Sequence, residues 1–134
     1  MKKVTVTVEV TENNYAGHLD DLPGCVSTGK TFRELKENIN EAVKDHLELS
    51  REYGDQIPSV FQNEYELIFR FDTQSILQHY RGVFTNAALE RISGINQRQL
   101  QHYASGKTRP RPVQAKKIEN ALHRLGEELL AIEL

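Results

Sequence analysis

The sequence predicts an α+β protein in two parts: a small sheet with one helix packed on it, followed by an all-α part. Three observations support this fold class. Valines alternate with polar residues at the start of the chain, an amphipathic helix pattern follows three short strand patterns, and the apolar spacing is helical after residue 72. The chain of 134 residues has room for one ordinary domain or two small ones.

The first part begins with three short strands. Alternation from Val4 to Val10 predicts a strand over residues 3–11 with one buried face. Two more strands are expected over 15–19 and 25–28, joined by a loop at Asp20 to Gly24. Because a short meander is unstable alone, its apolar face requires a cover.

An amphipathic helix supplies this cover. Thr31 is a suitable N-cap, Glu34 completes a capping box, and Gly54 ends the pattern. The apolar stripe consists of Phe32, Leu35, Ile39, Ala42, Val43 and His46. The opposite side carries Glu34, Glu37, Glu41, Asp45, Glu48 and Glu52. We interpret the acidic stripe as a solvated face, with docking of a basic partner as the alternative.

Two further elements join this helix to the rear of the chain. Residues 55–63 predict a loop, and alternation over 65–71 predicts a half-exposed antiparallel strand. Asp72 then caps a helix that continues through Tyr80, and residues 81–84 link it to the rear part.

Residues 85–112 have the pattern of a helix-turn-helix. Helical spacing ends at the turn Ser93 to Asn96, in which Gly94 suits the left-handed conformation. Asn96 is a good N-cap for the next helix, with Gln99 completing a capping box. Many helix-turn-helix sequences have alanine four residues before the turn glycine, whereas this chain has Glu90.

The second helix of the motif carries side chains that can read base pairs. Leu100 and Tyr103 share its apolar face. The other face presents Gln97, Arg98, Gln101 and His102, which we expect to read bases. Glutamine pairs with adenine and arginine with guanine in the major groove. Phosphate contacts are expected from Asn96, Lys107, Arg109 and Arg111. These features together favour DNA binding over a helical hairpin with a polar exposed helix.

Charge and composition add two constraints. The net charge is −2, but residues 1–84 carry −5 and residues 85–134 carry +3, which indicates two modules with different partners. No apolar run approaches the ~20 residues of a membrane span, and the start of the chain alternates unlike a signal peptide. With Cys25 as its single cysteine, the chain is expected to be cytoplasmic and to form no internal disulfide.

Residues Gly24 to Thr31 read GCVSTGKT, which matches the pattern of a phosphate-binding loop. Such a loop follows a buried parallel strand, yet two acids and a proline precede this one, so we reject the match. The histidines lack ligand spacing, Asp20 and Asp21 suit a turn, and Cys25 suits the core. We therefore predict no enzymatic activity, no cofactor and no metal.

The order of these elements and motifs resembles the HicB antitoxin family over residues 3–60. The matching residues are Tyr15, Leu22-Pro23-Gly24-Cys25, Gly29, Thr31, Glu34, Leu35, Ala42 and Ile57-Pro58. The rear part is similar to the helix-turn-helix type of that family rather than the ribbon-helix-helix type. The glycines and Thr31 are then turn and cap residues.

The resemblance implies a partial ribonuclease-H-like front domain that is catalytically inactive. Such a domain binds and masks HicA, a small basic toxin that cleaves messenger RNA, while the rear domain dimerises and represses the operon. Residues 1–63 would then bind toxin, 64–84 would join the domains, and 85–134 would bind DNA and dimerise. The candidate toxin contacts are Tyr15, His18, Asp20 and Asp21, together with the acidic helix.

The long helix after Pro112 is the expected dimerisation element, as a homodimer or a higher oligomer. Its apolar stripe includes Leu122, Leu125, Leu129 and Ile132, and the alternative is burial against the protein's own helix-turn-helix. Gly126 either kinks this helix or divides it in two. Two rival functions stay open: a stand-alone transcription regulator whose front domain senses a small molecule, and an active nuclease or nucleotide hydrolase.

Overall fold

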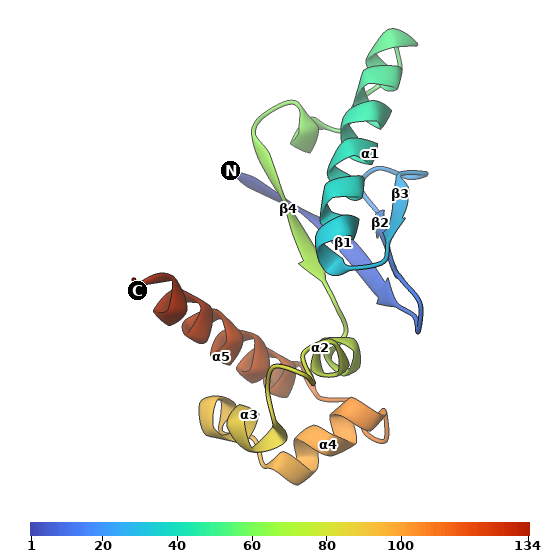
Figure 1. The fold of residues 1–134 in the computed structure, drawn as a ribbon. Helices are drawn as coiled ribbons and strands as arrows, with labels where there is room; N and C mark the ends of the chain where they lie inside the picture. The colour runs from blue at the N-terminus through green and yellow to red at the C-terminus, as the bar shows by residue number, and fades with distance from the viewer. The chain divides into compact units, whose positions relative to one another are not determined.

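The computed structural model describes residues 1–134 and divides into two units, Met1–Phe71 and Asp72–Leu134 (Figure 1). Four strands and one long helix form the first unit. Strands β1 (Lys2–Val10), β2 (Tyr15–Leu19) and β3 (Val26–Gly29) form an antiparallel meander. Strand β4 (Tyr65–Arg70) pairs with β1, so the strand order is β3-β2-β1-β4. Helix α1 (Phe32–Glu52) covers one face of this sheet, and the α+β class is confirmed.

Strand β4 runs parallel to β1, so the prediction of an antiparallel strand at residues 65–71 is wrong. Val4 is the register partner of Leu67, and Val6 of Phe69. Helix α1 lies between β3 and β4 in the chain and provides the long crossover that parallel pairing requires. The residues of β4 alternate because it is an edge strand covered on one face only, with Glu66, Ile68 and Arg70 exposed.

The core of the first unit lies between the sheet and α1. The sheet contributes Val4, Val6, Val8 and Leu19, and the helix contributes Leu35, Ile39, Val43 and Leu47. Each such side chain contributes roughly 1.5–3 kcal/mol when fully buried. Phe61 joins this core from a short 3-10 helix, Ser59–Phe61, and its ring packs edge-on against Tyr65 at 5.0 Å. The segment 55–63, predicted as a loop, therefore contains a core residue.

The segment that resembles a phosphate-binding loop turns the chain from β3 into α1. Thr31 Oγ1 accepts a hydrogen bond from Glu34 N at 3.1 Å, as predicted for the cap. Gly29 lies so close to the first turn of α1 that a Cβ atom there would be 2.4 Å from Leu35 N. These residues therefore have packing and capping roles.

Four helices form the second unit: α2 (Thr73–His79), α3 (Asn86–Ser93), α4 (Gln97–Ser105) and α5 (Pro112–Leu130). Their shared core consists of Leu77, Leu89, Ile95, Leu100, Tyr103, Ala104 and Ile118. Helix α5 continues without interruption through Gly126, so the predicted division there is wrong. An isolated glycine costs a helix only about 1 kcal/mol, which the packing of α5 at Ile118 and Ala121 outweighs. None of the helices has the length and apolar content needed to span a membrane.

Candidate nucleic-acid interface

A three-residue turn joins α3 to α4 and fixes the direction of α4. Gly94 ends α3 with a φ of 76°, and its N–H donates to Glu90 O at 2.8 Å. Ile95 is buried in the core. Asn96 Oδ1 then accepts from Arg98 N at 2.8 Å, so Asn96 is the predicted N-cap of α4. The cap bond goes to Arg98 N rather than to Gln99 N, the partner that a capping box would use.

The apolar face of α4 packs in the core of the unit, and α2 binds the end of this helix. Leu100 is fully buried, and Tyr103 and Ala104 are nearly so. Gln78 Nε2 of α2 donates to Ala104 O at 2.8 Å. At the end of α4, Gly106 has a φ of 82° and lies against the amide of Gln74. The helix therefore has a defined position within this unit, as a reading helix requires.

The opposite face of α4 carries the four predicted base-reading residues. Gln97, Arg98 and Gln101 are exposed, and His102 is half-buried. Two of these side chains are held by α3: Gln97 Nε2 donates to Glu90 Oε2 at 3.0 Å, and Gln101 Oε1 accepts from Asn86 Nδ2 at 3.0 Å. Sequence patterns did not indicate these two bonds, because the partners are seven and fifteen residues apart.

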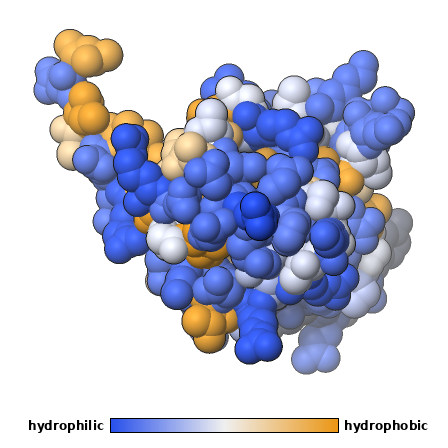
Figure 2. Space-filling model, turned by 90° about the horizontal axis from the view of Figure 1, so that it is seen from below, coloured by the Kyte–Doolittle hydropathy of each residue, from blue (hydrophilic) through white to orange (hydrophobic).

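Basic residues surround this face. Between Glu90 and Glu119 the chain has seven lysines and arginines and no acidic residue. They are Arg91, Arg98, Lys107, Arg109, Arg111, Lys116 and Lys117, and all are exposed. The loop from α4 to α5 carries three of them, and it turns back on α4 through a bond from Thr108 N to His102 O at 3.3 Å. Figure 2 shows a largely hydrophilic surface on the side where α3 and α4 lie in Figure 1.

The predicted dimerisation stripe on α5 is partly buried and partly exposed. Leu122 packs against the core of its own unit, beside the buried Ile118 and Ala121. Leu125 is half-buried, whereas Leu129 and Ile132 are 57% and 58% exposed. Helix α5 ends at Leu130, so the prediction that this helix carries Ile132 is wrong. Figure 2 shows apolar residues at the projecting C-terminal end of the chain. Burial against the protein's own helices therefore accounts for the first half of the stripe only.

The four candidate toxin contacts do not share one face of the sheet. Tyr15 packs against the core on the side covered by α1. His18 lies on the uncovered side, with Nε2 at 3.5 Å from Asp20 Oδ1, and Asp21 is exposed. The register places Thr7 beside His18, and His18 beside Val26, which is 64% exposed. The uncovered face therefore presents a mixed polar and apolar surface that the sequence did not indicate.

No group of three or more His, Cys, Asp or Glu side chains lies close enough to hold a metal ion. Cys25 is buried in the core of the first unit, where burial raises the pKa of its thiol. A buried neutral thiol is a poor nucleophile and a poor metal ligand.

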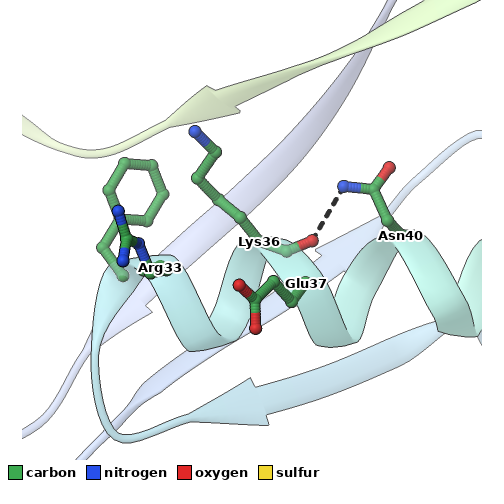
Figure 3. Close-up of a pocket in the computed structure, with 5 residues that line it drawn as sticks. Arg33, Lys36, Glu37 and Asn40 are labelled. Carbon is green, nitrogen blue, oxygen red and sulfur yellow. Dashed lines mark hydrogen bonds between the residues drawn. The ribbon is translucent and has the colours of Figure 1, made fainter.

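A shallow surface hollow of about 390 Å³ lies along α1 (Figure 3). It is lined by Phe32, Arg33, Lys36, Glu37 and Asn40. Asn40 Nδ2 donates to Lys36 O at 2.8 Å, and Lys36 Nζ is 5.5 Å from the centre of the Phe32 ring. Asn40 thus binds the backbone of the helix itself, and Lys36 lies over an aromatic ring.

Comparisons with known proteins concern the first unit. The model of the HicB-like antitoxin of bacterial toxin–antitoxin systems matches residues 4–68, from β1 into β4. A UPF0150 protein of Thermoplasma acidophilum is 31% identical over 58 residues, which are 43% of this chain and 84% of the relative. A UPF0150 protein of Helicobacter pylori is 39% identical over 44 residues, which are 33% of this chain and 61% of the relative. The matched range contains the crossover helix and most of the sheet, and the chain belongs to the HicB-like antitoxin family of bacterial toxin–antitoxin systems.

Proposed function

We propose that the chain masks a small basic ribonuclease toxin of the HicA type with residues 1–63 and represses its own operon by binding operator DNA with residues 85–134. Residues 64–84 then connect the two activities. In this proposal the protein acts in the cytoplasm as a regulator and not as an enzyme, and it requires no cofactor. Family membership supports the antitoxin role in general.

One observation carries the DNA-binding part of the proposal. Helix α4 has a polar exposed face, and the glycine turn before it and its buried opposite face fix its position. It lies between Glu90 and Glu119, where the chain has seven basic residues and no acidic one. In a helix-turn-helix the second helix enters the major groove, and flanking cations neutralise phosphates. We therefore assign base reading to Gln97, Arg98, Gln101 and His102. The phosphate contacts are Asn96, Lys107, Arg109 and Arg111.

Binding to the DNA upstream of the protein's own gene tests this assignment. Arg98→Ala should weaken specific binding by roughly 1–3 kcal/mol and reduce the ratio of specific to random-sequence affinity. Arg124→Ala is the matched control, because it removes the same charge from an exposed position on α5. An unchanged ratio for Arg98→Ala, or equal losses in both variants, would show that α4 does not read the sequence.

The toxin-binding part rests on charge and on the uncovered sheet face. Residues 1–84 carry −5, which suits a basic partner. We assign contacts to His18 on this face and to Asp20 and Asp21 in the loop after it, and we keep Tyr15, which lies on the covered side of the same strand, as a fourth contact. The acidic face of α1 is the competing surface. Co-expression with the protein encoded by the neighbouring reading frame tests the pairing. The variants His18→Ala and Asp20→Asn should weaken co-purification, while Glu41→Gln and Asp45→Asn on α1 should not.

The exposed end of α5 supports the dimerisation part. Leu129 and Ile132 present apolar surface that the chain leaves uncovered, and Leu122 and Leu125 continue the same stripe inward. A dimer would place two reading helices on two half-sites of one operator. If the neighbouring frame yields no toxin but the DNA binding holds, the stand-alone regulator becomes the better description.

A further inference from the structure

Glu90 takes part in the end of α3 through its backbone and connects α3 with α4 through its side chain. Its carbonyl oxygen accepts from Gly94 N at 2.8 Å and thereby ends α3. Its Oε2 accepts from Gln97 Nε2, on the first residue of α4, at 3.0 Å. The carboxylate forms no ion pair with any lysine, arginine or histidine of the chain. Its side chain is therefore directed at Gln97 rather than at a charge.

This contact fixes which end of the Gln97 amide faces outward. A carboxylate accepts hydrogen bonds and donates none, so only the NH₂ group of Gln97 can face Glu90. One N–H is then used, and the carbonyl oxygen Oε1 and the second N–H stay available. In the major groove adenine presents the N6 amino donor and the N7 acceptor, which match these two groups. Guanine presents two acceptors, so Oε1 would meet an acceptor there.

The position of Glu90 makes the contact costly for DNA binding in general. It is the last acidic residue before a stretch of 28 residues that contains lysines and arginines but no acidic residue. Its negative charge therefore repels the phosphates that the basic residues attract. The alanine that many helix-turn-helix sequences have at this position would not repel phosphates. A negative charge beside a reading residue lowers affinity for all DNA while it restricts the bases that the residue accepts.

We propose that Glu90 is a specificity-determining residue, which holds Gln97 in the orientation that reads adenine. The inference rests on the DNA-binding function proposed above and adds to it a base and a positioning residue. Holding one rotamer-rich side chain before binding corresponds to about a 3- to 10-fold preference. Gln101, another reading residue of α4, is also held by α3, but through the other end of its amide: its Oε1 accepts from Nδ2 of Asn86, the first residue of α3.

Selection from a random pool of duplex DNA tests the inference, and the operator sequence need not be known. The full chain should enrich a site with adenine at one position, and Gln97→Ala should lose that preference. Glu90→Ala should reduce the same preference about 3- to 10-fold and leave the other positions unchanged. Its affinity for random DNA should stay equal or rise, because a negative charge is removed. The double variant Glu90→Ala with Gln97→Ala should have the base profile of Gln97→Ala alone.

Two controls separate this inference from a structural effect. Glu127→Gln removes an equal charge from an exposed position on α5 and should keep the full base preference. Thermal unfolding checks that Glu90→Ala still folds, and Glu90→Gln offers a second variant that keeps the side-chain volume. If the parent chain enriches no sequence, the proposed DNA-binding function fails, and this inference fails with it. If the parent enriches a site and Glu90→Ala keeps the adenine preference, only the role of Glu90 is overturned.

Discussion

Gly29 shows at the residue scale how closely the first unit packs. A Cβ atom at this position would lie 2.4 Å from Leu35 N and 2.9 Å from the carbonyl carbon of Glu34. Because backbone atoms cannot move aside cheaply, Gly29→Ala should lower the free energy of unfolding by at least about 1–3 kcal/mol. Urea denaturation measures this change. Gly82→Ala is the control, since an added Cβ meets nothing within 4 Å there, and its effect should stay within about 0.5 kcal/mol.

The thiol of Cys25 gives a prediction about pH. Burial raises its pKa above the ordinary value of about 9.0. The folded state therefore favours the neutral thiol. Its contribution to the free energy of unfolding is fully present below the pKa that the thiol has in the unfolded chain. Stability should fall as pH rises through about 9 toward the folded pKa. Thermal unfolding between pH 7 and pH 10 measures the trend, and Cys25→Ser should lose this component of it. A thiol that alkylates as fast in the native protein as in urea would contradict the assignment.

The roles of single residues could be predicted where their hydrogen-bond partners lie close in the sequence. Thr31, Asp72 and Asn96 are caps in the structure because their partners lie two or three residues away. The burial of Phe61 depends on the fold around it and gave no local signal. The pairing of Glu90 with Gln97 also depends on how two helices cross, so the sequence showed only that Glu90 departs from the usual alanine.

At the scale of an element, helix α5 has a buried first half and an exposed last turn. Its first half is fixed by Ile118, Ala121 and Leu122 against the core, and its last turn presents Leu129 and Leu130 to solvent. If this exposed turn forms the proposed dimer contact, Leu129→Asp should abolish dimerisation while the unfolding temperature of the monomer changes little. Sedimentation measures the first effect and calorimetry the second.

Leu122→Ala serves as the comparison for α5, because this side chain packs against the core of its own unit. It should lower the free energy of unfolding by roughly 2 kcal/mol or more. If Leu129→Asp also unfolds the protein, the end of α5 packs against its own chain and does not form the dimer contact.

Strand direction was the main error at this scale. The alternation of residues 65–71 indicated one buried face correctly, and the structure has Tyr65, Leu67 and Phe69 half-buried. Alternation states which face is buried but not which neighbour a strand pairs with. The pairing with β1 joins residues about sixty positions apart, and no local pattern encodes it.

The distribution of charge gives a prediction for the whole molecule. If Lys107, Arg109 and Arg111 contact phosphates, each substitution by alanine should reduce the slope of log affinity against log salt by about one unit. The loss should be nearly the same on operator and random DNA, because phosphates carry no sequence information. Lys44→Ala in α1 is the control and should leave the slope unchanged. A slope that does not change in the triple variant would exclude this loop from the DNA contact.

The division of the chain into two structural units could be predicted from sequence, because charge, motifs and periodicity all change between the halves. The structure has two separate cores, one in each unit, whereas the different partners of the acidic and basic parts remain a prediction. The exposed composition of the uncovered sheet face could not be predicted, since it depends on the register of four strands.

The parallel pairing of β1 with β4 has a consequence for synthesis on the ribosome. Among the four strands of this sheet, β1 is translated first and is central, and its neighbour β4 is translated only about sixty residues later. Until then, its hydrogen-bonding edge lacks its native partner and can pair wrongly or be cleaved by proteases. Each newly made antitoxin thus spends an interval incomplete, and its supply depends on uninterrupted translation past Arg70.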